Sequence, residues 1–572
     1  MVFWLAFIGL NFLFFTIPYL LNFKNEPNPF SFLSGNFSVR KLIVFIIQKP
    51  TSDPWRIYFE YSLFILFCVF FSWKAPFLSY IGSLIASFGF VVIAYSGVML
   101  YVFNNVPVIK SDLEFAKTGV SILYKKKYFL YTALILFLVA IFFFFHWTTG
   151  YLINHSSPPS KITIVIAAIA IILLGTRNVF KYEYNRLHYR NVLFVGVYLW
   201  RNFKVSNSYN FLFDVDEAYF EKFNIYKDVK LKSKKPNIKI FSVESYGSLA
   251  HLMPDTAKVI QKTLADYSEV FKKKKISLAT GISLPPIFAG GSWLSYSSFL
   301  YGLKVDSKVL HNLLYSKLTT FQKYQSLLHF MSDQGYTNYS LMPLEYNRDE
   351  LIDWSLIQQN LQYDVGIEWT SLDYVGQKCS YLLRTSPPDQ YSLNKADQII
   401  TNNQKTPHSL FYSTLNSHTP FNTPIDIVPD WKSLNNTPFE TATNEKNKFD
   451  KYTLAINYQL KNLFDFIEKD EDPDTIYVLF GDHQPPGITK TAMGSSTPVH
   501  IICKNKELTL PFLREGFNEG LVPENPAHTN IKHEGFFSLF MQGLNMAYGE
   551  DSNLDLPYLP NGIQLMVDKI LP

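Results

Sequence analysis

The first third of the chain consists of long apolar runs separated by polar, mostly basic segments. The runs are Val2–Leu21, Tyr58–Trp73, Phe77–Phe103, Tyr128–Trp147 and Ile162–Leu174. A helix needs about 20 apolar residues to cross the hydrocarbon core of a bilayer. Three runs reach this length, Tyr58–Trp73 is slightly short, and the last reaches it only if it extends to about Val179. We therefore expect five transmembrane helices within residues 1–179.

The first apolar run also fits a signal peptide by its position. It has neither the basic start nor the small-residue cleavage site of a signal peptide, so we expect a retained anchor. Residues 180–235 are polar and mixed, with one short apolar stretch at Val192–Trp200. That stretch is too short to cross a bilayer as a helix, and an interfacial linker is expected.

From residue 236 to residue 572 the pattern changes to short apolar runs that alternate with helical periodicity. The strand-like runs are Ile238–Val243, Tyr336–Met342, Ser409–Leu415, Ile476–Phe480 and Pro498–Cys503. The helical patterns include Thr256–Phe271, Leu318–Met331 and Phe449–Ile467. Strands that alternate with helices are typical of crossover units. We therefore predict an α/β domain with a largely parallel central sheet at 236–572, after a multi-pass helical membrane domain.

The composition excludes some kinds of site. Aromatic and charged residues each make up 17% of the chain, and the net charge of +5 is mild, so nothing indicates nucleic acid binding. The cysteines, Cys68, Cys379 and Cys503, are too isolated for a disulfide framework or a thiolate zinc site.

The charges between the apolar runs predict an orientation in the membrane. Basic residues follow the first and third runs, at Lys24, Arg40, Lys41, Lys49, Arg56, Lys110, Lys117 and Lys125–Lys127. Basic loops normally remain in the cytoplasm. Applied to this chain, the rule places the C-terminal domain in the cytoplasm as well.

Two of the predicted strands end in potential metal ligands. The run Ile240–Val243 is followed by Glu244, and the run Leu479–Gly481 is followed by Asp482 and His483. Ligands of open α/β sheets bind beyond the carboxyl ends of the strands, so these side chains are expected to meet at one edge. Carboxylate oxygens and an imidazole together suit a divalent cation. The sequence therefore predicts a metal-assisted site.

A candidate nucleophile follows a pair of glycines. Gly290 and Gly291 permit a tight turn, and the residues after Ser292 have a helical pattern. A hydroxyl at a helix N-terminus lies among free backbone N–H groups that bind phosphate, and a cation could lower its pKa. The alternative is a serine that only caps a structural helix.

The order of these motifs resembles the alkaline phosphatase/sulfatase superfamily, in particular its membrane-anchored branch of lipoteichoic acid synthase-type phosphoglycerol transferases and phosphoethanolamine transferases. The metal set that this resemblance implies is Glu244, Ser292, Asp482 and His483. His418, in the Asn-Ser-His-Thr-Pro stretch at 416–420, is similar to the substrate-contacting histidine of the family. The resemblance also implies one divalent metal, with manganese expected and zinc or magnesium as alternatives.

Departures from the sulfatase pattern narrow the chemistry. Gly302 and Ser295 have the sulfatase spacing from Ser292, but Tyr296 stands in the place of the sulfatase arginine. The cysteine that sulfatases convert to formylglycine is also missing. Sulfate-ester hydrolysis is therefore disfavoured, and metal-assisted phosphoryl chemistry remains.

Thr280 is an alternative nucleophile. Thr280–Pro285 resembles the Thr-x-x-Ser-x-Pro motif of phosphoethanolamine transferases, and His528–His533 resembles their His-x-Asn-x-x-His motif. The disulfide cysteines usual around the first motif are missing here, and the spacing to Gly302 favours Ser292.

The resemblance implies a membrane-bound transferase that works through a covalent phosphoserine at Ser292. It would take a phosphoglycerol or phosphoethanolamine head group from a membrane phospholipid and pass it to a glycan or lipid acceptor. His418 is expected to contact the substrate, and Arg348 is a candidate phosphate clamp, with a surface salt bridge as its alternative. The rivals are a metal-dependent phosphodiesterase or sulfatase-like hydrolase, and a non-catalytic membrane receptor that retains the fold.

The same resemblance predicts where the domains lie. Its members have five spans followed by an extracytoplasmic catalytic domain. We therefore expect a multi-pass protein of the cell inner or plasma membrane, with residues 236–572 outside the cytoplasm and a role in the cell envelope. The loop charges predict the opposite orientation, so the two expectations disagree.

Overall fold

The computed structural model divides into two compact units, Met1–Asn207 and Ser208–Pro572. Each unit has its own hydrophobic core. The structure describes residues 1–22, 54–103, 112, 128–155, 159–180, 192–207, 224–307, 310–311, 326–345, 363–381, 384–403, 407–442, 447–489 and 494–564.

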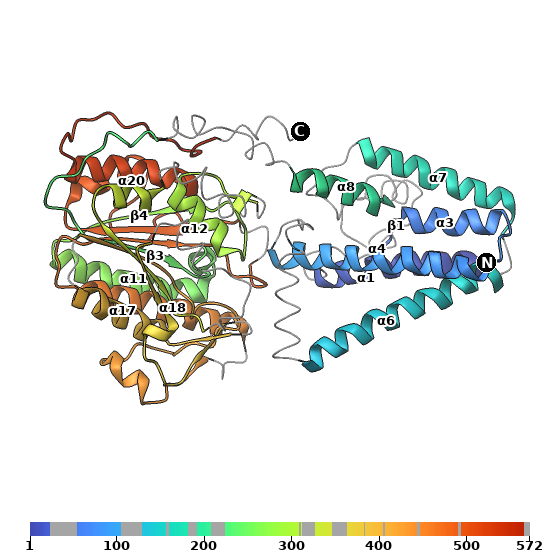
Figure 1. Ribbon diagram of the computed structural model, residues 1–572, viewed down its shortest axis with the longest axis horizontal. Helices are drawn as coiled ribbons and strands as arrows, with labels where there is room; N and C mark the ends of the chain where they lie inside the picture. The colour runs from blue at the N-terminus through green and yellow to red at the C-terminus, as the bar shows by residue number, and fades with distance from the viewer. Residues whose placement is uncertain are drawn as a thin grey trace. The chain divides into compact units, whose positions relative to one another are not determined.

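Each of the five apolar runs forms a helix in the N-terminal unit. The helices are α1 (Val2–Asn22), α3 (Phe59–Phe70), α4 (Pro76–Phe103), α6 (Tyr128–Gly150) and α7 (Lys161–Phe180) (Figure 1). By length and composition, Val2–Leu21, Pro76–Met99 and Tyr128–Asn154 are long and apolar enough to cross a membrane, whereas Phe59–Phe70 and Lys161–Thr176 are shorter. The three long helices fit a membrane domain, and the count of five spans stays a prediction.

Helix α6 exposes a large apolar surface. Its Leu136, Phe137 and Phe143 side chains are 63%, 53% and 59% exposed in the protein alone. Contiguous apolar surface of this kind is unfavourable in water and marks a site of contact with a membrane or another protein. The surface of α6 therefore fits contact with lipid.

A shorter helix, α8 (Val195–Ser206), packs on the apolar helices of the same unit. The Glu60 carboxylate of α3 accepts hydrogen bonds from the backbone N–H groups of Val195 (3.1 Å) and Gly196 (2.6 Å). A carboxylate is favourable there because the free N–H groups of a helix N-terminus carry partial positive charge. The apolar stretch that the sequence places in the linker therefore packs within the N-terminal unit.

An eight-stranded sheet forms the centre of the C-terminal unit. In spatial order its strands are β12 (Ile531–Lys532), β4 (Ser277–Leu284), β11 (Thr497–Cys503), β10 (Ile476–Gly481), β3 (Ile238–Val243), β9 (His408–Ser413), β5 (Thr337–Met342) and β6 (Val365–Glu368). The five strands from β10 to β6 run parallel, and β11 is antiparallel to both of its neighbours. The predicted α/β domain with a largely parallel sheet is thus confirmed.

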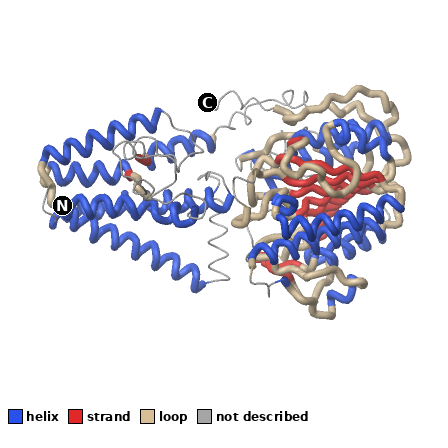
Figure 2. Tube along the Cα trace, turned by 180° about the vertical axis from the view of Figure 1, so that it is seen from behind, coloured by secondary structure: helices blue, strands red, loops and turns tan. Residues whose placement is uncertain are grey.

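Helices cover both faces of this sheet (Figures 1 and 2). One face carries α11 (Pro254–Lys273), α17 (Asp389–Asn403) and α18 (Lys448–Lys469), and the other carries α12 (Ser292–Tyr301) and α20 (His533–Tyr548). On the second face the ring of Phe299 stacks on Phe480 and Phe536, with centroid distances of 3.8 Å to each. Because helices cover both faces, every residue of β3 and β10 is buried, and strands in such a position are nearly continuous apolar runs.

Strand β4 is a strand that the hydrophobic pattern did not predict. Its sequence, Ser277–Leu284, consists mostly of small residues and includes Gly281. A Cβ added at Gly281 would lie 2.5 Å from the ring of Phe517, so the close approach of that ring requires glycine. Helix α15 (Leu327–Asp333) covers the last part of the helix expected at Leu318–Met331, and the rest lies outside the described residues.

Several shorter elements complete the described parts of the chain. They are β1 (Ile57–Tyr58), η2 (Tyr151–His155), β2 (Val192–Leu193), α10 (Leu249–Leu252), η5 (Trp369–Ser371), β7 (Cys379–Tyr381), β8 (Arg384–Ser386), η6 (Trp431–Asn435), η9 (Lys506–Thr509) and α19 (Leu510–Arg514). Of these, the antiparallel hairpin of β7 and β8 contributes to the site described below.

The register of β3 and β10 positions the site. The two strands are adjacent and parallel, and Val243 pairs with Gly481 at their carboxyl ends. The residues that follow, Glu244 and Asp482, therefore leave the sheet side by side. A Cβ at Gly481 would lie 1.9 Å from the carbonyl oxygen of Tyr246, so the chain can pass here only over glycine.

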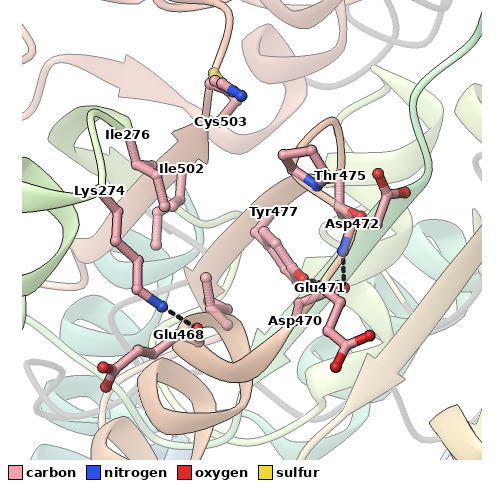
Figure 3. A pocket seen from close by; sticks show the side chains of 13 residues that line it. Lys274, Ile276, Glu468, Asp470, Glu471, Asp472, Thr475, Tyr477, Ile502 and Cys503 are labelled. Atoms are coloured by element: carbon pink, nitrogen blue, oxygen red, sulfur yellow. Dashed lines mark hydrogen bonds between the residues drawn. The ribbon is translucent and has the colours of Figure 1, made fainter.

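A cavity of about 160 Å³ lies at the opposite end of these strands (Figure 3). It is lined by the segment between α18 and β10, the residues that precede β4 and the end of β11. The polar groups in it bond mainly to neighbouring residues: Lys274 donates to the carbonyl oxygen of Glu468, and the backbone N–H of Asp472 donates to Asp470 (2.9 Å). Strand β10 separates this cavity from Asp482 by about 20 Å, at roughly 3.3 Å per residue.

Candidate metal centre

The structure brings Glu244, Asp482 and His483 together at the carboxyl ends of β3 and β10. One ligand atom from each residue lies within 4.8 Å of the others, and all three side chains are buried. Nε2 of His483 lies 3.4 Å from Oδ2 of Asp482 and 3.7 Å from Oε1 of Glu244. Two carboxylates and an imidazole at such distances form a donor set that suits a divalent cation.

The hydrogen bonds of this group leave donor atoms directed at its centre. Nδ1 of His483 donates to the backbone oxygen of Gln484 (2.9 Å), so Nε2 is the nitrogen that faces the carboxylates. Metal-binding histidines are commonly oriented in this way. Oδ2 of Asp482 is buried and accepts no hydrogen bond from the described residues. A buried carboxylate oxygen without a donor is unfavourable, and a cation would supply its missing partner.

The pKa values of the two carboxyl groups move in opposite directions. Burial and the neighbouring charge of Glu244 raise the pKa of Asp482 to about 7. Burial also acts to raise the pKa of Glu244, but the charges of His418 and His483, together with the hydrogen bonds from Ser245 and Ser292, outweigh it, and this pKa is lowered. Like charges held close together cannot both ionise easily. One carboxyl group of the pair therefore keeps a proton, which a bound cation would displace.

The hydroxyl of Ser292 lies at the edge of this group. Oγ of Ser292 donates to Oε2 of Glu244 (3.2 Å) and lies 3.2 Å from Nε2 of His483. Ser292 is the first residue of α12 and is preceded by Gly290 and Gly291, whose φ angles are 65° and 75°. Glycine adopts positive φ without steric cost, so this pair allows the chain to turn sharply into the helix. The expected nucleophile and the expected ligands thus meet.

The position of α12 is tied to the strand that carries the ligands. Oγ of Ser295 donates to the backbone oxygen of Asp482 (2.6 Å), one turn after Ser292. Gly302 ends the helix with a φ of 61°. Ser295 and Gly302 are the two residues whose spacing from Ser292 resembles that of sulfatases, and in this chain they fix one end of the helix each.

His418 lies in the loop after β9. Its Nδ1 donates to the backbone oxygen of Thr419 (2.6 Å), and its ring packs against Tyr381 with a centroid distance of 4.2 Å. The charge of His418 lowers the pKa of Glu244, which places this histidine within the electric field of the metal centre. Both contacts hold the imidazole in one orientation.

Two further residues, Thr414 and Ser417, form hydrogen bonds with the backbone of Glu244. Oγ of Ser417 donates to the backbone oxygen of Glu244 (2.6 Å), and Oγ1 of Thr414 accepts from its backbone N–H (3.0 Å). The Asn-Ser-His-Thr-Pro stretch therefore contributes through Ser417 as well as through His418. The motif resemblance implies no role for Ser417.

Asp389 anchors this loop and was not among the predicted site residues. Its carboxylate accepts from the backbone N–H groups of Leu415 (3.0 Å) and Asn416 (2.9 Å) and from the hydroxyl of Tyr412 (2.6 Å). In return, Oδ1 of Asn416 accepts from the backbone N–H of Asp389 (2.6 Å). Burial raises the pKa of Asp389 to about 6. The signal in the sequence is only an aspartate at a helix start, which is common at helix N-termini.

Thr280, the alternative nucleophile, lies within β4 and is fully buried. Its Oγ1 forms a hydrogen bond with Nδ1 of His500 (2.8 Å), and Nε2 of His500 contacts the hydroxyl of Tyr246 (3.1 Å). Ser283 of the same motif bonds to Nδ1 of His533 (2.7 Å). These hydroxyl groups are engaged inside the sheet, whereas Ser292 faces the ligands. Arg348 lies outside the described residues.

The chain was compared with protein families and with known proteins. Residues 265–502 match the family model described as Sulfatase. None of the curated proteins matches the chain.

Several solved structures resemble the chain. The lipoteichoic acid synthase LtaP from Listeria monocytogenes is 17% identical, over 50% of this chain and 71% of the other, with a TM-score of 0.35. The C-terminal periplasmic domain of EptC from Escherichia coli in complex with Zn is 13% identical, over 59% and 91%, with a TM-score of 0.37. The Streptococcus pyogenes phosphoglycerol transferase GacH in complex with sn-glycerol-1-phosphate is 17% identical, over 60% and 87%, with a TM-score of 0.35.

Proposed function

We propose that this chain, whose residues 265–502 match the family model described as Sulfatase, is a metal-dependent transferase that moves a phospho-head group from a membrane lipid to a glycan or lipid acceptor. The head group is of the phosphoglycerol or phosphoethanolamine type, and it passes through a covalent phosphoserine at Ser292. One observation carries this proposal: Oγ of Ser292 lies 3.2 Å from both Oε2 of Glu244 and Nε2 of His483, inside a group that suits a cation.

The membrane unit supports a lipid as the donor. Three helices are long and apolar enough to cross a bilayer. A domain anchored in this way works where lipid donors are concentrated, which replaces a search through solution by a search along the membrane surface. A soluble phosphate ester as substrate would leave the apolar helices without a role in the reaction.

Glu244, Ser292, Asp482 and His483 would hold one divalent metal. Manganese is proposed first, with zinc and magnesium as alternatives, since mixed oxygen and nitrogen ligands are compatible with more than one of them. When bound, such a cation lowers the pKa of the serine hydroxyl and neutralises negative charge on the phosphoryl oxygens. Among the atoms that would bind the metal, Oδ2 of Asp482 fits best, because it is buried and accepts no hydrogen bond from the described residues.

The protein groups then account for the bonds and protons of the first half-reaction. Oγ of Ser292 attacks the phosphorus of the donor, and the bond from phosphorus to the oxygen of the lipid alcohol breaks. The proton of Ser292 faces Oε2 of Glu244, which already accepts it in a hydrogen bond. His418, held by Thr419 and Tyr381, protonates the departing oxygen.

The second half-reaction reverses these roles. The acceptor hydroxyl attacks the phosphorus of the phosphoserine and its proton passes to His418. The bond from phosphorus to Oγ of Ser292 breaks, the serine oxygen takes back its proton from Glu244, and the head group leaves as a new phosphodiester. If water took the place of the acceptor, the same geometry would give a phosphodiesterase. The two reactions therefore differ only in which nucleophile enters second.

A head-group transfer assay tests the proposal. Full-length protein in detergent is given a phospholipid with a labelled head group, with and without candidate acceptors. Ser292→Ala is expected to lower turnover by about 10³-fold or more, because loss of a nucleophile removes the covalent step. Thr280→Ala is the matched control and should retain turnover after correction for any loss of folded protein.

The outcomes separate the rivals. Label on the acceptor supports a transferase, and label released as free head group with every acceptor supports the hydrolase. Full turnover by Ser292→Ala together with loss of turnover in Thr280→Ala contradicts the assignment of the nucleophile. Absence of turnover with every lipid and metal tested favours the non-catalytic receptor.

A further inference from the structure

Ser245 follows the first metal ligand and has an unfavourable backbone conformation. Its φ angle is 58°, in the left-handed region that residues with a side chain rarely adopt. The residue is fully buried. Such a conformation is unfavourable and persists only where the surrounding structure imposes it. Positive φ at a buried serine beside a ligand therefore requires an explanation.

The conformation directs two donors of Ser245 at two different ligands. Its backbone N–H donates to Oδ1 of Asp482 (2.8 Å), and its Oγ donates to Oε1 of Glu244 (2.7 Å). The backbone N–H of His483 donates to the same Oδ1 of Asp482 (2.7 Å). One oxygen of each carboxylate thus accepts a hydrogen bond from Ser245, whereas the second oxygen of each, Oδ2 of Asp482 and Oε2 of Glu244, does not.

The second oxygens have different surroundings, and both fit a cation. Oδ2 of Asp482 accepts no hydrogen bond from any described residue and lies 3.4 Å from Nε2 of His483. Oε2 of Glu244 accepts only the hydroxyl of Ser292 among the described contacts. A carboxylate that was free to rotate would present either oxygen. Ser245 removes that freedom for both carboxylates at once.

The backbone oxygen of Ser245 is also fixed by a hydrogen bond. The hydroxyl of Tyr452, on α18, donates to the backbone oxygen of Ser245 (3.0 Å). The next glycine cannot be replaced without a clash, because a Cβ at Gly247 would lie 1.9 Å from Oε1 of Gln484. These contacts keep the peptide of Ser245 in place while its N–H and Oγ point to the ligands.

We propose that Ser245 is a positioning residue of the metal centre, which selects one oxygen of Glu244 and one oxygen of Asp482 as metal ligands. The inference rests on the proposed function, because it assumes that these residues hold a cation. Ser245 itself acts through the two carboxylates. Partners of this kind orient ligands, and their loss typically weakens metal binding by about 10- to 100-fold.

Binding of Mn²⁺ to the full-length, metal-free protein in detergent tests this inference without an activity assay. The free Mn²⁺ signal in electron paramagnetic resonance gives the dissociation constant directly. Ser245→Gly removes the hydroxyl and also relieves the strained φ, since glycine adopts this region at no steric cost. Ser245→Ala removes the hydroxyl and keeps the strain. Both variants are expected to bind Mn²⁺ about 10- to 100-fold more weakly.

Ser242→Ala is the matched control. Ser242 is a buried serine on the same strand, two residues before Glu244, and its Oγ has no hydrogen bond to any described residue. This variant should bind Mn²⁺ as the unaltered protein does. Thermal unfolding of the metal-free variants is measured alongside, because Ser245→Gly is expected to be at least as stable as Ser245→Ala.

Each outcome decides the matter. Unchanged Mn²⁺ affinity in Ser245→Gly overturns the inference and leaves the proposed function intact. Weak binding in Ser245→Ala alone also overturns it, because Ser245→Gly, which lacks the same hydroxyl, would then bind Mn²⁺ normally. If the unaltered protein binds neither Mn²⁺ nor Zn²⁺ nor Mg²⁺, the metal-dependent function fails, and the role of Ser245 fails with it.

Discussion

Two buried carboxyl groups determine the protonation of the candidate metal centre. Glu244 and Asp482 are buried next to each other, and burial together with the charge of Glu244 raises the pKa of Asp482 to about 7. The folded protein therefore binds a proton that the unfolded chain, with an ordinary aspartate, releases near pH 4. Without metal, this group favours the folded state below about pH 4, and its contribution declines as pH rises toward 7.

Metal binding is expected to depend on pH in the opposite sense. Below pH 7 a cation must displace the proton of Asp482, so the apparent affinity for Mn²⁺ should fall about tenfold per pH unit and level off above pH 7. Calorimetric titrations between about pH 5.5 and pH 8.5 measure this slope. Asp482→Asn should bind weakly, with a flatter pH dependence. A pH-independent affinity of the unaltered protein contradicts the assignment of the proton to this carboxyl group.

The contacts of helix α12 with the core fix the position of Ser292, the proposed nucleophile. Phe299 of this helix stacks on Phe480 of β10 and on Phe536 of α20. At its first turn, Ser295 bonds to the backbone oxygen of Asp482. The helix is therefore fixed against β10 at two points, and Ser292 is placed relative to the ligands by the element rather than by its own side chain.

Ser295→Ala is expected to displace the start of α12. Loss of the bond to the Asp482 carbonyl should lower the free energy of unfolding by about 1–3 kcal/mol, and turnover should fall about 10- to 100-fold because small misplacements of a nucleophile are costly. Ser298→Ala is the control, since Ser298 donates to Leu294 within the helix and accepts from Val305. Equal loss of turnover in both variants, at equal stability, argues against the specific role of Ser295. Denaturant unfolding and the transfer assay supply the two measurements.

The whole molecule combines an apolar helical unit with an α/β unit. The three long apolar helices suit a membrane, and the large sheet with helices on both faces suits an aqueous compartment. A transferase that modifies a cell-envelope glycan needs its α/β unit outside the cytoplasm. The basic residues after the first and third apolar runs favour the opposite orientation.

A topology measurement distinguishes these orientations. We expect a reporter fused to the C-terminus to be active when it is of the kind that works only outside the cytoplasm, and a cytoplasm-specific reporter to be inactive. The proposed role in the cell envelope requires this result, because an acceptor in the envelope would lie outside the cytoplasm. The reverse pattern would agree with the loop charges and exclude the envelope role. Protease protection of intact cells provides an independent control.

The sequence by itself determined the class of the fold and the strand ends that carry the ligands. Strands β3 and β10 appear as apolar runs because both of their faces are covered, and each run stops where a carboxylate begins. The five apolar helices can be predicted for a similar reason, since the apolar residues of each helix are consecutive in the sequence. The resemblance of the motifs added Ser292 and His418.

Only the tertiary structure decided which hydroxyl lies next to the potential metal ligands and which residues position those ligands. Thr280 and Ser292 both follow plausible motifs, but β4 buries Thr280 against His500, and α12 brings Ser292 to Glu244. Strand β4 itself has no strand pattern, because its small residues are selected by close neighbours. The bond from Ser245 to Asp482 joins residues 237 positions apart. Periodicity reports how deeply a residue is buried, whereas hydrogen-bond partners depend on which distant segments cross there.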